Sequence, residues 1–159
     1  MSEFECIQVE VVNKVAYASL NRPDKANALD HKLWFEIGDL ANWVSTTPEI
    51  RALVLQGAGK HFTAGIDFSL IMQIVGETAS LQDGHKQEAL RTKIIALQAS
   101  FTALENCSKP VIASIQGSCI GGGIDLITAC DIRYASEQAV FSVKEIDLAI
   151  VADIGTLQR

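Results

Sequence analysis

Short apolar runs separated by polar turns recur along the chain. These runs predict β-strands at residues 7–11, 15–20, 52–55, 110–115, 131–134 and 139–141. The first two flank Val12-Asn13-Lys14, which we interpret as the connection of a hairpin. A turn signal, Asn21-Arg22-Pro23-Asp24, follows the second strand.

Apolar residues that recur every three or four positions predict helices between these strands. The clearest helix carries its apolar stripe at Leu90, Ile94, Leu97, Phe101 and Leu104. Further helices are predicted at 30–43, with Asp30 as N-cap, at 69–75 and at 124–129. Residues 155–159 look like the start of another helix, and residues 78–84 look flexible. Strands that alternate with helices favour an α/β layer architecture, and the length suits one domain spanning 1–159.

Composition and charge exclude several classes of partner. The chain has 159 residues, of which 48% are hydrophobic and 20% charged, as expected for a globular core. Its net charge of -6 lacks the basic footprint of a protein that binds nucleic acid or an anionic membrane. The least charged stretch, 110–124, contains too many polar residues and glycines for a membrane span. We therefore expect neither a nucleic acid nor a membrane as partner.

The cysteines show neither metal-ligand spacing nor a disulfide framework. Cys6, Cys107, Cys119 and Cys130 form no CxxC pair, and the three histidines do not cluster with them, so a metal site is not expected. The chain is also too long and too poor in cysteine for a disulfide scaffold. Its first residues lack a secretory pattern. Reduced, mostly buried thiols in a cytoplasm-like compartment are the expectation.

Three carboxylates stand in apolar surroundings: Asp125, Glu145 and Asp153. An unpaired charge is costly to bury, so such an acid neutralises, finds a partner or has a chemical role. A raised carboxylate pKa suits proton transfer near neutral pH. Together these acids indicate proton chemistry on a carbon acid. The alternative is that they are surface acids between core residues.

Two glycine-containing loops, 57–67 and 117–123, follow two predicted strands. Backbone N–H groups at such strand-to-helix turns can bind a phosphate or hold a developing oxyanion. The phosphate-loop and dinucleotide patterns are absent from both loops, and Ser118 is misplaced for a serine-hydrolase elbow. Cys119 has no obvious histidine partner for nucleophilic catalysis. A purely structural glycine turn remains the alternative for each loop.

Several segments resemble, in order and spacing, the crotonase superfamily of enoyl-CoA hydratases and isomerases. They are Asn21-Arg22-Pro23 with Asn27-Ala28-Leu29, Phe62 to Asp67, Lys109 to Ala113, Gly121-Gly122-Gly123, and Cys130 to Arg133. The resemblance extends from about residue 7 to residue 159. It implies an α/β crotonase-like fold, a spiral of ββα units.

The acids discriminate within this superfamily. A typical enoyl-CoA hydratase carries glutamates at the positions of Asp125 and Glu145. Here the first position is aspartate and a third acid, Asp153, is present. This combination resembles the Δ3,5-Δ2,4-dienoyl-CoA isomerase branch, which moves two conjugated double bonds in fatty acid β-oxidation. The resemblance thus implies isomerisation of a 3,5-dienoyl-CoA to a 2,4-dienoyl-CoA.

The resemblance also implies roles for particular residues. The backbone N–H groups of Ile66 and Gly122 would hold the thioester oxygen. Glu145 would serve C2 and Asp153 would serve C6, although the two could exchange roles. Asp125 would line the pocket and tune its neighbours. The residues expected to contact coenzyme A or the acyl chain are Lys25, Ala26, Ala28, Ala64, Gly65, Asp67 and Gly121. No metal and no separate cofactor is expected, because coenzyme A is part of the substrate.

Length is the main departure from the family pattern. The family fold usually continues for about a hundred residues, with helices that close the acyl pocket and build trimers or hexamers. We therefore expect a chain that lacks the C-terminal helical region, so its activity and oligomer formation are in doubt. A cytoplasmic location is expected, and a C-terminal peroxisomal signal stays open if the chain is truncated. The alternative functions are enoyl-CoA hydratase, monoene enoyl-CoA isomerase, or an inactive acyl-CoA-binding or interaction fragment.

Overall fold

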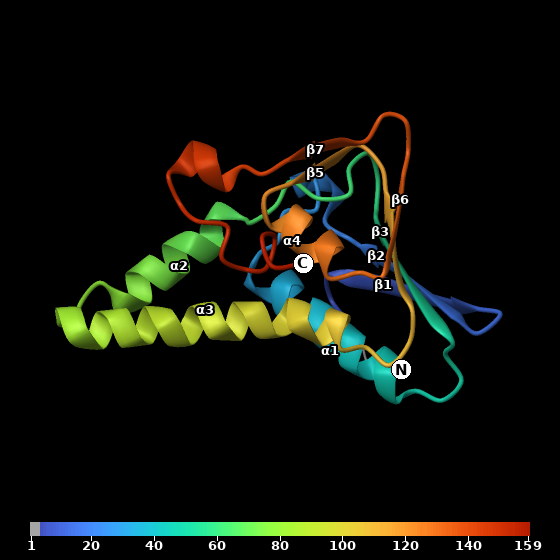
Figure 1. The fold of residues 1–159 in the computed structure, drawn as a ribbon, viewed down its shortest axis with the longest axis horizontal. Helices are drawn as coiled ribbons and strands as arrows, with labels where there is room; N and C mark the ends of the chain where they lie inside the picture. The colour runs from blue at the N-terminus through green and yellow to red at the C-terminus, as the bar shows by residue number, and fades with distance from the viewer. Residues whose placement is uncertain (1–3) are drawn as a thin grey trace.

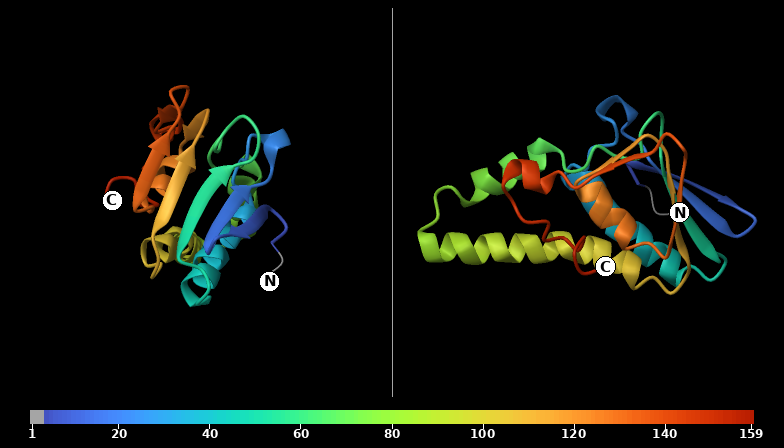
Figure 2. Two further views of the ribbon diagram at one scale, coloured as in Figure 1. Left: turned by 90° about the vertical axis from the view of Figure 1, so that its right-hand side faces the viewer. Right: turned by 45° about the horizontal axis from the view of Figure 1, so that its top comes forward.

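The computed structural model describes residues 4–159, which form an α/β fold around one mostly parallel sheet (Figures 1 and 2). The strands lie in the order β1-β2-β3-β4-β6. Their bounds are Ile7–Val12 for β1, Val15–Leu20 for β2, Ala52–Gly57 for β3, Val111–Ile115 for β4 and Ile132–Ala135 for β6. The β1–β2 pair is antiparallel, and every later pair is parallel. The predicted hairpin is confirmed, with Asn13 and Lys14 both at positive φ.

A second, two-stranded sheet lies beside the first. It consists of β5 (Ser118–Ile120) and β7 (Val140–Ser142), which pair in parallel. The sequence predicted residues 117–123 as a glycine turn, so β5 was missed. A three-residue strand whose pairing partner lies about twenty residues away leaves little local pattern.

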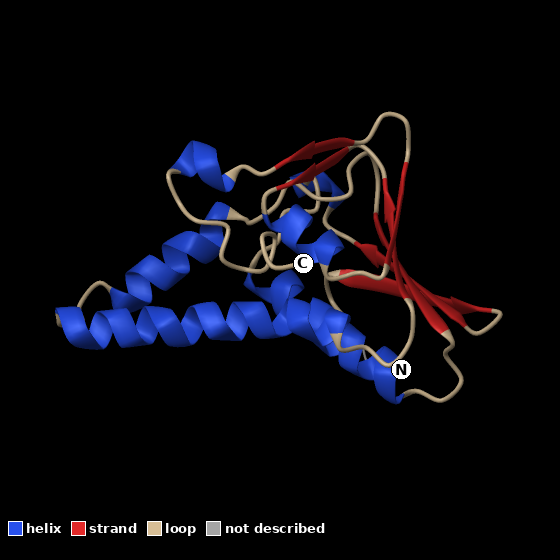
Figure 3. Ribbon diagram, in the orientation of Figure 1, coloured by secondary structure: helices blue, strands red, loops and turns tan. Residues whose placement is uncertain are grey.

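Helices cover one side of the main sheet and extend beyond it (Figure 3). They are α1 (His31–Thr46), α2 (Phe68–Thr78), α3 (Asp83–Glu105) and α4 (Gly122–Thr128), with short 3₁₀ helices η1 (Pro23–Lys25) and η2 (Glu145–Leu148). Asp30 caps α1 as predicted, since its carboxylate accepts the N–H of Leu33 at 2.9 Å. None of the helices in residues 4–159 is long and apolar enough to cross a membrane.

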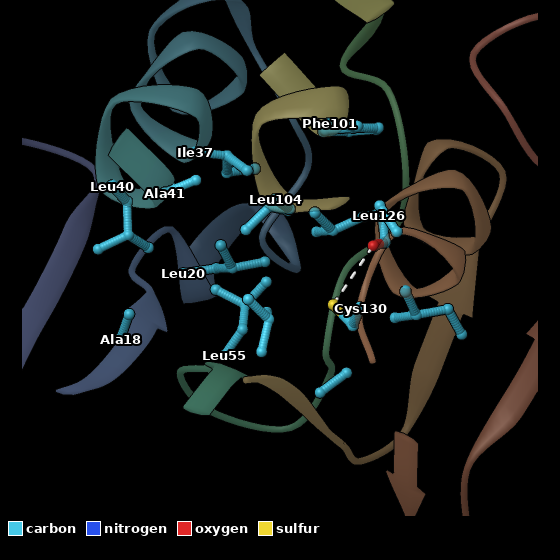
Figure 4. Packing of buried hydrophobic residues seen from close by; sticks show 14 of the residues in the cluster. Ala18, Leu20, Ile37, Leu40, Ala41, Leu55, Phe101, Leu104, Leu126 and Cys130 are labelled. Carbon is cyan, nitrogen blue, oxygen red and sulfur yellow. Dashed lines mark hydrogen bonds between the residues drawn. The ribbon is translucent and has the colours of Figure 1, made fainter. Parts of the chain in front are cut away.

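The core is formed where α1 and α3 pack against the sheet (Figure 4). The ring of Trp34 stacks on Phe101 with centroids 4.6 Å apart, and its indole N–H donates to the carbonyl of Leu97 at 3.0 Å. The helix α4 joins this core through Leu126, whose carbonyl accepts the Cys130 thiol. Burial of these side chains is the main stabilising term for the fold.

Two other expectations meet a different outcome. Residues 155–159 form turns rather than a helix, with the N–H groups of Gln158 and Arg159 donating to the carbonyl of Gly155. Residues 78–84 hold the end of α2 and the start of α3. The red C-terminal segment in Figure 1 returns from η2 toward α3 and α4, where it forms hydrogen bonds with Gln98 and Asp125.

Candidate functional site

The two glycine loops are joined side by side where β3 and β4 end. Thr63 pairs with Cys119 of β5. The N–H of Thr63 donates to the carbonyl of Ser118 at 3.0 Å, and the N–H of Ile120 donates back to Thr63 at 3.2 Å. Parallel strands present their carboxyl ends at the same edge of a sheet, so segments far apart in sequence meet there.

The peptide between Gly65 and Ile66 has a fixed orientation. The carbonyl of Gly65 accepts the N–H of Leu29 at 2.8 Å. A trans peptide points its N–H to the side opposite its carbonyl, so the N–H of Ile66 faces away from Leu29. This N–H donates to no group among residues 4–159 and lies at the wall of a cavity. It is available to a ligand.

The second donor begins α4. The carbonyl of Gly121 accepts the N–H of Ile124 at 2.7 Å, so the N–H of Gly122 points out from the helix start. Within residues 4–159 it has no acceptor. A Cβ placed on Gly65 would lie 3.4 Å from the Gly122 nitrogen and 2.5 Å from the carbonyl oxygen of Ile120. Only glycine permits this approach, and Gly65 also has a φ of +88°. The structure therefore brings both predicted oxyanion donors to one place.

A cavity of about 390 Å³ opens beside these donors. It is bounded by Ala64, Gly65, Ile66, Phe68, Ile120, Gly121, Lys144, Glu145, Asp147, Leu148 and Ile150. Glu145 is the first residue of η2, and its carboxylate approaches the backbone of Gly121, where an added Cβ would lie 3.3 Å from Oε1. Of the predicted residues, this cavity gathers Ala64, Gly65, Ile66, Gly121 and Glu145.

The carboxylate of Glu145 is poised to accept a proton. Its Oε2 is buried and has no hydrogen-bond partner among residues 4–159. Burial raises the pKa of Glu145, and the negative charges of Asp125 and Asp153 raise it further. A partnerless carboxylate oxygen with a raised pKa next to two free N–H groups suits removal of a proton from a carbon next to a thioester.

Asp125 is buried in α4, with only 1% of its surface exposed. Its Oδ1 accepts the backbone N–H of Thr156 at 2.9 Å and the Thr156 hydroxyl at 2.6 Å. Burial raises the pKa of Asp125, while the two hydrogen bonds from Thr156 oppose that shift. Asp125 does not line the cavity at Glu145, so it acts on this cavity through its charge.

The surroundings of Asp153 are largely exposed rather than buried. Asp153 is exposed, and so is part of the apolar run before it: Ile150 is 50% and Val151 73% exposed to solvent. Asp153 lines a second cavity of about 330 Å³ between α3 and the C-terminal segment. Its carbonyl accepts the side-chain amide of Gln98 at 2.6 Å. The structure therefore separates Asp153 from the cavity that holds Glu145.

The predicted coenzyme A contacts lie on the loop between β2 and α1. Lys25 is exposed at the end of η1. The carbonyl of Ala26 accepts the N–H of Ala64 at 2.9 Å, so this loop is tied to the first glycine loop, and Ala28 lies two residues further on the same loop. Asp67 already has partners: it accepts the N–H of Ser69 at 2.9 Å and pairs with Arg22 at 3.2 Å. The hydrogen bond from Ser69 chiefly lowers the pKa of Asp67.

Comparison with known proteins agrees with this geometry. Residues 10–159 match the family described as enoyl-CoA hydratase/isomerase. The chain belongs to that family. This membership confirms the resemblance seen in the sequence and its α/β crotonase-like fold.

Similar proteins include curated relatives and solved structures. A peroxisomal Δ(3,5)-Δ(2,4)-dienoyl-CoA isomerase from Arabidopsis thaliana is 49% identical over 98% of this chain and 56% of its own length. The mitochondrial Δ(3,5)-Δ(2,4)-dienoyl-CoA isomerase of Mus musculus is 45% identical over 98% of this chain and 48% of its own length. An enoyl-CoA hydratase structure from Shewanella pealeana, 25% identical, superposes with a TM-score of 0.82 over 96% of this chain and 55% of that chain. The chain thus spans about half the length of the curated relatives it matches.

Several residues that build this family site were not singled out as functional from the sequence. Asn27 is buried, and its side-chain amide donates to the carbonyls of Ala58 and His61 at 2.9 and 2.8 Å. The hydroxyl of Thr63 accepts the N–H of Gly65, and the hydroxyl of Thr156 donates to the carboxylate of Asp125. Asn27 and Thr63 lie inside the segments that resemble the family. This position indicates that they matter but does not indicate what they do. Both residues have hydrogen-bond partners more than thirty positions away, so a local pattern contains only part of their roles.

Proposed function

We propose that this chain carries the oxyanion hole and proton-transferring acids of a Δ3,5-Δ2,4-dienoyl-CoA isomerase. The observation that carries the proposal is the partnerless Oε2 of Glu145 at a cavity shared with the free N–H of Ile66 and the glycine turn before Gly122. Names of the most similar curated relatives support the choice of reaction.

The reaction begins with the thioester oxygen accepting the N–H groups of Ile66 and Gly122. Glu145 removes a proton from C2, and the charge spreads over the dienolate onto the thioester oxygen. One oxyanion donor typically contributes about 3 kcal/mol to such a step. Protonation at C6 then moves the double bonds from C3 and C5 to C2 and C4, so atoms and charge balance.

In this proposal a protonated Asp153 donates its proton to C6, and the proton that Glu145 took from C2 returns to Asp153 through solvent after the product leaves. When Asp153 is ionised, its negative charge adds to the burial that raises the pKa values of Glu145 and Asp125. Burial is the main cause of the raised pKa of Glu145, and the charge of Asp125 adds to it without contact with the substrate. At the other end of the substrate, Lys25 attracts the phosphates of coenzyme A, while Ala26 and Ala28 offer backbone groups to the adenine.

A single variant tests the assignment of Asp153. Asp153→Asn in the intact protein is assayed with a 3,5-dienoyl-CoA, following the absorbance of the conjugated 2,4-dienoyl thioester. We expect kcat to fall about 100-fold or more, because general acid–base groups contribute about 10²–10⁴. Glu137→Gln, which changes an exposed acid that lines neither cavity, serves as control. Unchanged isomerisation by Asp153→Asn would remove Asp153 from the mechanism.

The exposure of Asp153 favours a second candidate function, a monoene enoyl-CoA isomerase. There Glu145 alone would remove the C2 proton of a 3-enoyl-CoA and return it at C4. Turnover of 3-enoyl-CoA that survives in Asp153→Asn, with no turnover of the 3,5-diene by the wild type, would select this candidate. Binding of acyl-CoA without turnover of either substrate would instead indicate a non-catalytic fragment.

A further inference from the structure

Thr63 lies at the centre of the site without lining its cavity. It is fully buried, with 0% of its surface exposed, and its hydroxyl has two partners. The hydroxyl donates to the carbonyl of Asn27 at 2.6 Å and accepts the N–H of Gly65 at 3.1 Å. A hydroxyl has one proton to donate, and this one is already committed, so Thr63 has none to give a ligand.

These contacts fix the peptide that precedes Ile66. The N–H of Gly65 is held by Thr63, and the carbonyl of Gly65 is held by the N–H of Leu29. Gly65 has a positive φ and no side chain, so by itself it would be the freest residue of the loop. With both of its backbone groups tied, the direction of the Ile66 N–H is set before any ligand arrives.

Thr63 also contacts the second donor loop. A Cβ placed on Gly123 would lie only 2.5 Å from the Thr63 methyl carbon, so this methyl packs directly on the backbone next to Gly122. The backbone of Thr63 is bonded to both Ser118 and Ile120. One side chain thus uses its hydroxyl on the loop of Ile66 and its methyl on the loop of Gly122.

We propose that Thr63 is a positioning residue that sets the N–H groups of Ile66 and Gly122 at the spacing a thioester oxyanion requires. The inference rests on the proposed function only in that these two groups hold that oxygen. Preorganised donors avoid reorganisation during the reaction, and a misplacement of about 1 Å can cost about 100-fold in rate. The hydroxyl matters more than the methyl, because α4 already fixes Gly122 while Ile66 lies in a loop.

Two substitutions separate the two parts of the side chain. Thr63→Val keeps the branched shape and the methyl but removes the hydroxyl. Thr63→Ser keeps the hydroxyl and removes the methyl. Each is compared with wild type for binding of acetoacetyl-CoA, whose enolate places negative charge on the thioester oxygen, and for binding of coenzyme A alone. The enolate is followed by its near-ultraviolet absorbance, and backbone folding is checked by circular dichroism.

We expect Thr63→Val to lower affinity for the acetoacetyl-CoA enolate by about tenfold or more and kcat by about 10- to 100-fold. Affinity for coenzyme A should stay within about twofold, because it involves no oxyanion. Thr63→Ser should restore enolate binding to within about threefold of wild type. Equal losses of enolate and coenzyme A affinity in Thr63→Val would overturn the proposal.

The outcomes also separate this inference from the proposed function. If the wild type binds the enolate but does not isomerise dienoyl-CoA, the isomerase assignment fails. The role of Thr63 is then decided by the difference in enolate affinity between Thr63→Val and Thr63→Ser. If the wild type shows no enolate, both fail. Should Thr63→Val not fold, Thr63→Ser carries the test alone, and a loss of enolate affinity above about tenfold in that variant would overturn it.

Discussion

The two halves of the site are built in different ways. The amide half (residues 63–66 and 120–122) lies between core strands and is bonded to segments more than thirty residues away. The acid half (residues 144–159) lies on exposed turns and is held by a few side-chain contacts, such as those of Gln98 and Asp125. Donors that must not move are part of the scaffold, whereas acids that exchange protons stand on its edge.

Glu145→Gln should give the largest effect and should separate activity from stability. We expect kcat to fall by about 10²–10⁴, since the base that removes the C2 proton is lost. The measurement is kcat and KM with a 3,5-dienoyl-CoA, with Glu137→Gln as control. In the wild type, activity should rise as pH increases through the raised pKa of Glu145, because the base must be ionised.

The same variant should not be less stable than wild type at neutral pH. A carboxyl whose pKa is raised on folding favours the folded state below its unfolded pKa, and this contribution is lost as pH rises through the folded pKa. Glutamine has no charge to bury, so Glu145→Gln should gain stability at pH 7 relative to wild type and lose that gain in acid. Urea unfolding at both pH values measures this. A clear loss of stability at pH 7 would place Glu145 in the scaffold and break the comparison.

Gly65→Ala tests the amide half, where stability and activity should fall together. The added Cβ would meet the Ile120 carbonyl oxygen at 2.5 Å in a residue with φ of +88°. We expect a loss of about 2–4 kcal/mol in the free energy of unfolding, together with loss of enolate binding. Gly76→Ala is the matched control, because an added Cβ there meets nothing within 4 Å, and it should stabilise α2 by up to about 1 kcal/mol. Wild-type stability in Gly65→Ala would contradict the close approach of the two loops.

Thr156→Val sharpens the comparison at the contact between the halves. The variant removes the hydroxyl donor to Asp125 and keeps the backbone N–H, so we expect a loss of about 1–2 kcal/mol at neutral pH. These bonds favour the ionised carboxylate, so the loss should shrink as pH falls through the raised pKa of Asp125 and the group is protonated. Thermal unfolding across pH measures it, with Thr156→Ser as the control that keeps the hydroxyl. A pH-independent loss would point to packing instead.

Lys25→Ala should give the smallest effect. Lys25 is exposed, so its attraction for the phosphates of coenzyme A is screened by solvent. We expect KM to rise about two- to fivefold at low salt with kcat unchanged, and this difference to fade at high salt. Arg51→Ala, which removes an exposed positive charge before β3, at the opposite end of that strand from the glycine loop, is the matched control. An effect on kcat would place Lys25 nearer the reacting atoms than the loop allows.

Much of the fold follows from local pattern, and the failures have physical causes. The strands β2, β3 and β4 and the helix stripe at Leu97, Phe101 and Leu104 were predicted because burial imposes their periodicity. The strand β5 was missed because its pairing is with β7, not with a sequence neighbour. The apolar run around Asp153 left open whether this acid is buried, because an apolar run need not be buried itself: Val151 is 73% exposed.

The candidate site likewise has parts that could be predicted from the sequence and parts that could not. The segments around Ile66 and Gly122 were recognised because the family pattern includes them, and the structure brings them together. The roles of Thr63 and Thr156 could not be predicted in full, since each side chain has a hydrogen-bond partner 36 or 31 positions away. The sequence pattern identifies the backbone turns that carry the site. The side-chain partners that hold these turns become visible only in the folded structure, where the loops meet.

The strand order β1-β2-β3-β4-β6 has a consequence for the time course of synthesis. Each strand of the main sheet docks beside one that the ribosome has already released, so the sheet can grow in one direction as the chain emerges. Asp125 is the exception. Its carboxylate is translated thirty-one residues before the threonine that satisfies it, and so it must wait, solvated, until the end of the segment arrives. The hydrogen bonds that fix the Asp125 carboxylate can therefore form only after the segment that follows η2 has emerged.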